Sequence, residues 1–492
     1  MAAFPRTFRR IPWRNIPAIP ALFAAAALVV GLGWALATGP LNGPDESAHV
    51  AYTQYLAETG HGPQRSTGQQ TDSTQMLRLL IEGNLAPIVG HQEGAPTWSA
   101  IGQLDADLGD LPKSSRADGS GPNPLAANPP LYYFYEALAY RLSLSADPLN
   151  RLMVLRVANV ALFVLTVILA WLLACEVFAA TWPRVLMTGL VAFQPKLGFM
   201  AGVVNSDTLL VTLTTGFLLA SARLIKRGPT ARRVAAVALF GAAGAMTHGR
   251  GLALVPAGFV VLALGVWPLR RSARRVALLS AQAGAILVGG TLGAVFWTRA
   301  HNGGAAFGGE LETVSHAGFN TRQFLSYVWQ FYFDKLSFMS PMLGPPYGYR
   351  QMYINTFFGS FGSLEVDYPL WVYDLIQVAA LLGFAALGAA VLLHWDAVRR
   401  NVRFVIAAIA TFGSFFASLH IAGYRALEGG GMDPLITGRY LLPCVALYAL
   451  AASWTISVLA RRAGPWIAGV LLSTSALAAI AGIGLTAWRF GA

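Results

Sequence analysis

The sequence contains few charged residues. Only 12% of its 492 residues are Asp, Glu, Lys or Arg, whereas soluble globular proteins carry about 25%. Mean hydropathy is +0.52, and the apolar residues fall in runs of about 20, the length that a helix needs to cross a bilayer. This shortage of charge excludes a soluble enzyme. The apolar residues run continuously and do not alternate with polar residues, and this pattern excludes a transmembrane barrel.

Cysteine is scarce as well. The two cysteines, Cys175 and Cys444, both lie inside apolar runs, where they are expected to be small core residues. A disulfide framework and a cysteine-based zinc site are therefore excluded. The sequence also lacks an internal repeat of fixed period and a long low-complexity tract.

The apolar runs predict about eleven membrane helices, and hence an all-α integral membrane protein. The spans 233–247 and 250–267 are separated only by His248-Gly249-Arg250 and are alternatively one long, broken helix. The first run exceeds the apolar stretch of a signal peptide and is expected to be a retained anchor. The expected spans are 17–39, 152–178, 185–204, 207–224, 233–247, 250–267, 276–298, 372–394, 403–423, 439–460 and 465–487.

The distribution of charge predicts the orientation. The formal net charge is +12, which in a soluble protein would suggest nucleic acid, but the basic residues form short clusters between apolar runs. Short basic loops mark the cytoplasmic face. With the N-terminus inside, only Glu176 and Asp396 among 23 acidic residues lie near that face. Carboxylate chemistry is therefore expected on the outer face of the cytoplasmic (inner) membrane.

This topology divides the chain into four parts. They are a cytoplasmic tail (1–16), an N-terminal transmembrane module (17–298), a second outer loop (299–371) and a C-terminal transmembrane module (372–492). The first outer loop (40–151) lies within the N-terminal module and is expected to contain helical pieces at 44–58 and 129–143. Connections longer than about 15 residues are usually functional or disordered, so both outer loops are candidates for the site.

The residues directly after the first span carry the clearest chemical signal. Asp45, His49 and Tyr52 are spaced by four and three residues, so they are expected to share one face of a helix. A carboxylate and an imidazole at this spacing can form a hydrogen-bonded dyad or a pair of metal ligands. The side chain of Glu46 is expected to point about 100° away from this face. The structural alternative is a helix cap, with acidic residues at the positive end of the helix dipole.

Short motifs along the chain, taken in order, resemble the GT-C superfamily of membrane glycosyltransferases, which transfer sugars from polyprenyl-phosphate donors outside the membrane. The chain is similar to the aminoarabinose-to-lipid A transferases and the protein O-mannosyltransferases, and it looks like a further bacterial branch. The lipid A transferases have a basic residue before Pro-Pro, where this chain has Asn128. The motifs are Asp45-Glu46, Asn128-Pro129-Pro130-Leu131-Tyr132-Tyr133, Arg151-Leu152, Asn205-Ser206-Asp207 and Gly438-Arg439-Tyr440-Leu441-Leu442-Pro443.

The resemblance implies an inverting hexosyl- or pentosyltransferase. Its donor would be a sugar on polyprenyl phosphate, and its acceptor a hydroxyl on a cell-envelope glycan, lipid or protein. Asp45 would be the general base, and Glu46 or His49 would orient the acceptor or tune the base. Further substrate-binding residues implied on this basis are Tyr52, Tyr132, Asn205 and Asp207.

The phosphate of such a donor needs positive charge near the outer surface. Lys196 lies within a predicted span, and a charge there suggests a functional role such as a phosphate contact. The alternative is that Lys196 only pairs with a structural partner, Asp207 or Glu136. For the arginines the alternative is interfacial anchoring. In the second loop, aromatic residues such as Tyr347 could stack on a sugar ring or belong to an interfacial belt. The candidate cations are Lys196, His248, Arg250 and Arg439, with Arg350 as a further substrate contact.

Two alternatives stay open. A divalent cation (Mg²⁺ or Mn²⁺) could be held by Asp45, Glu46 and His49, or by Glu310, Glu312 and His316, although neither set has a diagnostic metal spacing. The alternative function is a lipid or polysaccharide transporter (flippase), which intramembrane charges and a broken helix near 248 would fit. The missing repeat and the two long outer loops favour the enzyme.

Overall fold

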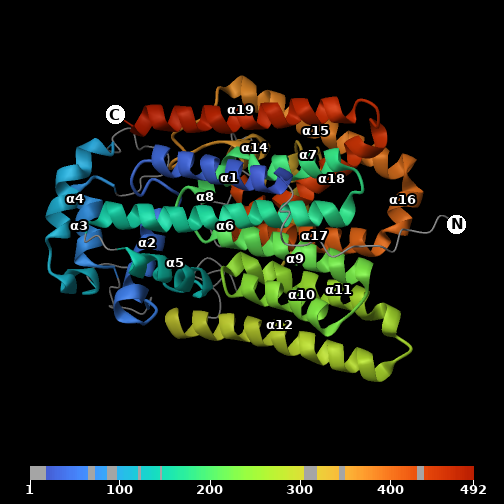
Figure 1. The fold of residues 1–492 in the computed structure, drawn as a ribbon, viewed down its shortest axis with the longest axis horizontal. Helices are drawn as coiled ribbons and strands as arrows, with labels where there is room; N and C mark the ends of the chain where they lie inside the picture. Colours follow the sequence, from blue (N-terminus) through green and yellow to red (C-terminus); the bar gives the residue numbers. More distant parts are fainter. Residues whose placement is uncertain are drawn as a thin grey trace.

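The computed structural model describes the chain as a bundle of long helices with a smaller helical lobe at one end (Figure 1). Within the described residues the secondary structure is helical, apart from one isolated bridge between Phe361 and Val366. The predicted all-α class is therefore confirmed. The described residues are 18–64, 72–85, 97–119, 123–143, 147–303, 319–342, 349–428 and 437–491.

In the described part of the chain, nine helical segments are long and apolar enough to cross a membrane. They coincide with nine of the predicted spans. They are α1 (Ala18–Ala37), α6 (Pro148–Val177), α9 (Asp207–Arg227), η3–α11–η4 (Gly249–Ala253, Leu254–Val266, Trp267–Leu269), α12 (Ala273–His301), α15 (Leu370–Leu393), α17 (Val402–Glu428), η5–α18 (Gly438–Cys444, Val445–Leu459) and α19 (Gly464–Phe490).

The two remaining predicted spans are shorter in the structure. The expected span 185–204 is divided into α7 (Thr181–Ala192) and α8 (Pro195–Ala201). The division has a local cause, because Pro195 has no N–H to continue the ladder and the side chain of Gln194 caps α8 at the Leu197 N–H. The other, α10 (Ala231–Ala245), has 15 residues and packs on η3 and α11 as a separate helix. The total of eleven spans stays a prediction.

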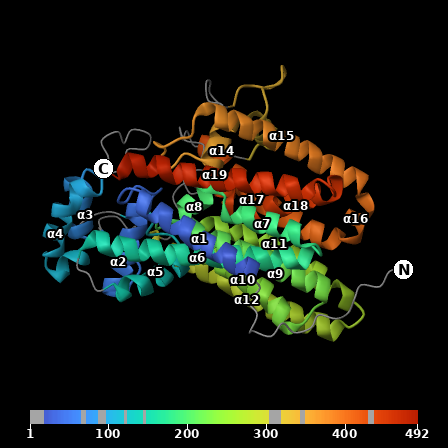
Figure 2. The same cartoon turned by 45° about the horizontal axis from the view of Figure 1, so that its top comes forward.

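Close packing of the first helices fixes the centre of the bundle. Helix α6 lies between α1 and α9, and α9 packs in turn on α10. A Cβ atom at Gly31 of α1 would lie 2.7 Å from Val160 of α6, so only glycine permits this approach. Small residues play this part in membrane helix pairs. Helices α12 and α15 form opposite edges of the bundle (Figures 1 and 2).

The first outer loop forms a helical lobe with its own apolar core, which includes Tyr52, Leu56, Leu79 and Tyr133. The two helical pieces predicted from the sequence are present as α2 and α5. Together they place the chain that leaves α1 against the start of α6. The helices of this lobe are α2 (Glu46–Thr59), α3 (Thr74–Glu82), η1 (Ser99–Ile101), α4 (Gly102–Gly109), η2 (Lys113–Arg116) and α5 (Leu131–Leu142).

The second outer loop contributes α13 (Thr321–Tyr332) and α14 (Tyr349–Phe358). Helix α13 packs on α17 through Tyr327, Phe331 and Tyr424. After α14 the chain makes a tight turn, which is closed by the bridge between Phe361 and Val366. Asn42, in the connection between α1 and α2, accepts a hydrogen bond from the Ser363 N–H in this turn. Parts of the second loop thus reach the region around α2. Short α16 (Trp395–Arg400) joins α15 to α17.

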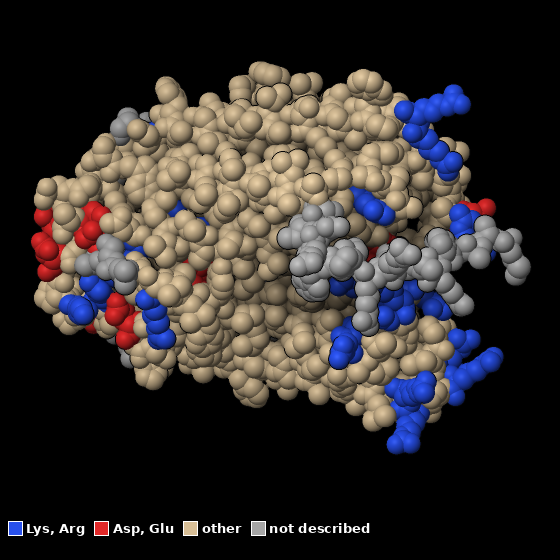
Figure 3. Space-filling model, viewed as in Figure 1, with Lys and Arg blue, Asp and Glu red and all other residues tan. Residues whose placement is uncertain are grey.

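Charged side chains gather at the two ends of the face shown in Figure 3. Most acidic side chains on this face lie at the end formed by the first-loop lobe, beside several basic ones, whereas the opposite end is mainly basic. Glu176, one of the two acids expected among the basic loops, pairs there with Arg223 and Arg227. This separation is the one that the sequence predicts, while the side of the membrane that each end faces stays a prediction.

Candidate functional site

The site is built on the connection between α1 and α2. Asp45 stands directly before α2 and has a left-handed backbone, with φ 57° and ψ 16°, a conformation that costs a residue other than glycine of the order of 1 kcal/mol. Its side chain makes no capping hydrogen bond to the helix. Asp45 thus occupies the N-cap position of α2 without capping the helix through its side chain, so a cap does not account for its carboxylate.

Glu46 has a wholly structural environment. Its carboxylate receives two hydrogen bonds from Arg156 of α6, at 2.8 and 2.7 Å, and two more from the N–H groups of Gly43 and Val204. Arg156 also donates to the carbonyls of Ala35, Thr38 and Gly39 at the end of α1. Both side chains are 0% exposed. We call this pair the buried clamp; it holds α1, α2 and α6 together and leaves Glu46 no free oxygen for a substrate.

Asp45 has a different partner. Its Oδ2 lies 3.0 Å from Nη2 of Arg439, at the start of η5, and 55% of its side chain is exposed. Burial alone would raise the pKa of Asp45, but the positive charge of Arg439 outweighs it and lowers the pKa below its usual value. The carboxylate is therefore ionised and open to a ligand.

A second ion pair lies beside the first. Asp207, the first residue of α9, pairs with Arg250 of η3. The guanidinium carbons of Arg250 and Arg439 lie 4.2 and 5.3 Å from the centre of the same ring, that of Tyr440. The charge of Asp207 also acts on Asp45, so the two pairs form one unit. We call these residues the arginine–carboxylate cluster: Asp45, Asp207, Arg250, Arg439 and Tyr440.

The cluster contains polar atoms without partners. Among the described residues nothing hydrogen-bonds to Nη1 of Arg250, Nη1 of Arg439, Oδ2 of Asp207 or the hydroxyl of Ser206, all of which are buried. Buried polar groups in proteins are nearly always satisfied, and an exception calls for an explanation such as a missing ligand. Two guanidinium N–H groups suit the oxygens of an anion such as a phosphate.

His49 lies beside the cluster in an aromatic setting. Its Nδ1 is 3.0 Å from the hydroxyl of Tyr133, and no hydrogen bond joins its ring to Asp45. The predicted Asp45–His49 dyad is therefore not formed, because α2 begins only at Glu46. Burial lowers the pKa of His49 to about 4, so the imidazole is neutral near pH 7. The hydroxyl of Tyr52, one turn along α2, donates to the Asn128 carbonyl.

The remaining first-loop and turn residues support the site. Asn205 donates to the Pro44 carbonyl and accepts from the Asp207 N–H, so it ties the turn before α9 to the turn that carries Asp45. Tyr132 is fully buried, 3.4 Å from Oδ1 of Asn159. The Nδ1 atom of His248 accepts from the Arg250 N–H, and burial lowers the pKa of His248 to about 3, so it brings no positive charge.

Two predicted contacts bind other partners than the cluster residues, and a third is not described. Lys196 of α8 is 1% exposed; it donates to the Ser360 carbonyl and lies 4.6 Å from the centre of the Phe199 ring. Neither Asp207 nor Glu136 is its partner. Arg350 is an exposed residue at the start of α14, where it approaches the Tyr332 carbonyl. Tyr347, like Glu310, Glu312 and His316, lies outside the described residues.

The donor set at this site does not suit a divalent cation. Across the described ranges, no three His, Cys, Asp or Glu side chains are placed to hold a metal ion together. Glu46 is saturated by Arg156, and Asp45 is paired with Arg439. No step proposed below uses a metal ion.

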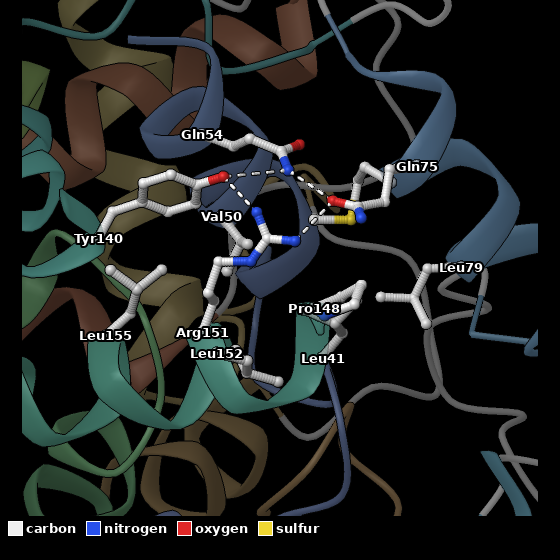
Figure 4. Close-up of a pocket in the computed structure, with 11 residues that line it drawn as sticks. Leu41, Val50, Gln54, Gln75, Leu79, Tyr140, Pro148, Arg151, Leu152 and Leu155 are labelled. Carbon is white, nitrogen blue, oxygen red and sulfur yellow. Dashed lines mark hydrogen bonds between the residues drawn. The ribbon is translucent and has the colours of Figure 1, made fainter. Parts of the chain in front are cut away.

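A separate polar network lies inside the first-loop lobe. Arg151 donates to Tyr140 and Gln75, and Gln54 donates to Gln75 (Figure 4). These side chains line a cavity of about 20 Å³ together with Leu41, Val50 and other apolar residues. A space of this size accommodates about one water molecule, so the network is structural.

Sequence reasoning missed several residues of this site. Arg156 lies inside the predicted span 152–178, and a charge in an apolar run was the signal that could have identified it. Tyr440 and Tyr133 stand within quoted motifs, but nothing in their spacing distinguishes them from other aromatic residues. Their roles follow only from the convergence of η5, α5 and α2.

Fold and site together define a polytopic helical membrane protein with a charged cluster at one end of its bundle. A family described as "Predicted membrane protein (DUF2142)" matches residues 28–448. The chain therefore belongs to this family. No curated protein sequence matches the chain.

Solved structures with a similar helical arrangement include glycosyltransferases. One is ArnT from Cupriavidus metallidurans in the apo state, with 13% sequence identity and a TM-score of 0.46. The same protein bound to undecaprenyl phosphate has 12% identity and a TM-score of 0.45. Each match covers 96% of this chain and 75% of that chain. The archaeal oligosaccharyltransferase AglB from Archaeoglobus fulgidus, in complex with an inhibitory peptide and a dolichol-phosphate, has 12% identity and a TM-score of 0.48, over 97% of this chain and 56% of its own. Values this low assign no activity to the chain.

Proposed function

We propose that the protein is an inverting glycosyltransferase. It moves a sugar from a polyprenyl-phosphate donor to a hydroxyl of a cell-envelope glycan, lipid or protein, on the outer face of the cytoplasmic membrane. The observation that carries this proposal is the arginine–carboxylate cluster. It offers an exposed carboxylate, Asp45, next to two arginines that each have a buried Nη1 atom without a hydrogen-bond partner among the described residues.

The arginines suit the leaving group. A polyprenyl phosphate departs as an anion and needs preorganised positive charge, with no general acid. Arg250 and Arg439 stand over one aromatic ring, Tyr440, which keeps two planar donors close together despite their like charges. Asp207 pairs with Arg250 and Asp45 pairs with Arg439, and Nη1 of each arginine, which no described residue accepts from, would donate to a bound phosphate.

Asp45 suits the part of general base. The acceptor oxygen attacks the anomeric carbon, its proton passes to the Asp45 carboxylate, and the bond between that carbon and the phosphate oxygen breaks. In the free protein Arg439 holds Asp45 as a weak base with a lowered pKa. A donor phosphate that takes over Arg439 releases the carboxylate and raises its pKa. Donor binding would thereby activate the base.

The alternative transporter function has less support. A transport path needs polar groups along the bundle. In the described parts of the chain, the fully or nearly buried charged side chains gather instead at the first-loop end and in the adjoining α8. They are Glu46, Asp72, Glu136, Arg151, Arg156, Lys196 and Asp207.

Binding of the lipid phosphate tests the donor part of the proposal. We expect full-length protein in nanodiscs to bind undecaprenyl phosphate and not undecaprenol, which lacks the phosphate. Arg250→Gln and Arg439→Gln should each weaken binding about tenfold to a hundredfold, as expected for the loss of one charge-assisted hydrogen bond. Arg350→Gln is the matched control, because Arg350 lies on α14 away from the cluster.

Transfer is tested with radiolabelled polyprenyl-phosphate hexoses and pentoses and a cell-envelope fraction as acceptor. We expect the wild-type protein to release polyprenyl phosphate from one of these donors. Equal binding of undecaprenol and undecaprenyl phosphate, together with no release from any donor, would contradict the proposed function. Release of intact donor on the opposite side of a sealed vesicle would favour the transporter.

A further inference from the structure

Three residues of the first-loop lobe form a chain of hydrogen bonds that ends at His49. The side-chain amide of Asn128 donates to the hydroxyl of Tyr133 at 3.2 Å. That hydroxyl lies 3.0 Å from Nδ1 of His49. The first contact joins the turn before α5 to α5, and the second joins α5 to α2.

A hydrogen bond from the Tyr133 hydroxyl to Nδ1 would fix the position of the imidazole proton. A phenolic hydroxyl has a single hydrogen to donate. Since Tyr133 accepts from Asn128, its own hydrogen is available for Nδ1 of His49, and a neutral imidazole with an accepting Nδ1 carries its proton on Nε2. Burial keeps the pKa of His49 at about 4, so this neutral form is the one present near pH 7.

Aromatic rings hold the imidazole in place. Tyr133 stacks on Tyr52 with centroids 3.5 Å apart and an angle of 10°. His49 lies against Tyr133 at 5.8 Å and 23°, and edge-on to Tyr132 at 6.0 Å and 83°. With the ring fixed in this way, Nε2 has a fixed direction as well. Nε2 makes no hydrogen bond to any residue that the structure describes.

Three of the four charges that act on His49 belong to the arginine–carboxylate cluster, namely Asp45, Asp207 and Arg439. The fourth is Glu46 of the buried clamp. His248 is a further titratable neighbour and is neutral. The imidazole of His49 therefore lies within the electrostatic influence of Asp45 and Arg439, where the substrate would bind.

We propose that Asn128 and Tyr133 lock His49 as its Nε2–H tautomer, so that His49 donates a hydrogen bond from Nε2 to an oxygen of the substrate. His49 is then a substrate contact and not a base, and Asn128 and Tyr133 are positioning residues. The substrate contact rests on the proposed function. The oxygen belongs to the phosphate or to a sugar hydroxyl, and the experiments below distinguish the two.

The tautomer is tested without any substrate. Nitrogen-15 NMR on full-length protein labelled at histidine, with His49→Gln to assign the signal, reports which ring nitrogen is protonated. We expect one neutral tautomer with the proton on Nε2, and a mixture of both tautomers in Tyr133→Phe, which lacks the donating hydroxyl. A proton on Nδ1 in the wild-type protein, or a charged imidazole at pH 7, would overturn the lock.

The substrate contact is tested with three substitutions. Glutamine at position 49 can place an amide N–H near the position of Nε2, whereas asparagine places it near Nδ1 and leucine provides none. We expect His49→Leu and His49→Asn to weaken ligand binding about tenfold, the usual loss for one hydrogen bond, and His49→Gln to retain it. Equal affinities for His49→Gln and His49→Leu would overturn the contact. The thermal unfolding midpoint of each variant shows whether it is folded.

Two ligands identify the oxygen. If undecaprenyl phosphate alone shows the tenfold loss, His49 contacts the phosphate; if only the sugar-bearing donor shows it, His49 contacts a sugar hydroxyl. If the wild-type protein binds neither ligand, the proposed function and the substrate contact fail together. The NMR result still decides the lock, so the two failures are distinguishable.

Discussion

Asp45 and Glu46 are neighbours in the sequence, yet the structure gives them opposite environments. The buried clamp encloses Glu46 completely, with four donors on its two oxygens. The arginine–carboxylate cluster holds Asp45 by one contact and leaves 55% of it exposed. One pair of adjacent acids thus contains a structural residue and a candidate base. An acidic pair in a motif does not imply two residues with the same role.

The largest expected effect concerns activity. We expect Asp45→Asn to lower the rate of sugar transfer by about 10²–10⁴, the usual loss when a general base is removed. Its unfolding midpoint should change little, because the side chain is half-exposed and caps nothing. Single-turnover transfer and thermal unfolding in detergent measure the two effects. Transfer at a near wild-type rate would show that Asp45 is not the base.

A substitution in the buried clamp should instead lower the stability of the protein. Arg156→Met leaves the Glu46 carboxylate buried and unpaired, which destabilises a protein by about 3–5 kcal/mol. It also leaves the carbonyls of Ala35, Thr38 and Gly39 without their donor. We expect poor folding or a much lower unfolding midpoint. Arg78→Met, the same substitution in the exposed pair with Glu82, is the control and should have little effect.

The pH dependence of transfer sharpens the comparison. Arg439 lowers the pKa of Asp45 in the free protein, so the acid limb of kcat/KM should lie below the usual pKa of an aspartate. In the bound state the phosphate occupies Arg439, and the acid limb of kcat should lie at higher pH. In Arg439→Gln burial acts without this opposing charge, so the limb of kcat/KM should move upward.

If the acid limb of the pH profile in Arg439→Gln stays at its wild-type pH, Arg439 does not control the pKa of Asp45. Arg425→Gln is a suitable control for this measurement. Arg425 pairs with Glu428 at the end of α17 and lies over the Phe319 ring, so it makes no contact with the cluster.

Much of the fold could be predicted from the sequence. Nine apolar runs became long helices, because a backbone in lipid must satisfy its own hydrogen bonds. The division of 185–204 was also within reach, since Pro195 stands in the run. The lobe of the first loop was harder, because its elements are short and their packing depends on contacts between distant residues such as Gln54 and Tyr140.

The site was predictable in composition but not in pairing. Asp45, His49, Asp207, Arg250 and Arg439 were all expected to belong to it, and they lie together. Which arginine meets which carboxylate depends on how η3, η5 and α9 approach α2, and no sequence spacing encodes that. The left-handed backbone of Asp45 was likewise invisible, since aspartate enters this region more readily than most residues but also adopts other conformations.

Lys196 should show the smallest effect, and it tests where the site ends. The sequence suggested a phosphate contact, but Lys196 is 1% exposed and binds the Ser360 carbonyl and the Phe199 ring. It thus resembles the clamp in burial and lacks a carboxylate partner like that of Arg156. Replacing a buried charge with a well-packed apolar side chain is often nearly neutral. We therefore expect Lys196→Met to change the free energy of unfolding by less than about 1 kcal/mol and to bind undecaprenyl phosphate as the wild-type protein does. A large loss of binding with an unchanged unfolding midpoint would extend the phosphate site to α8 and restore the contact that the sequence suggested.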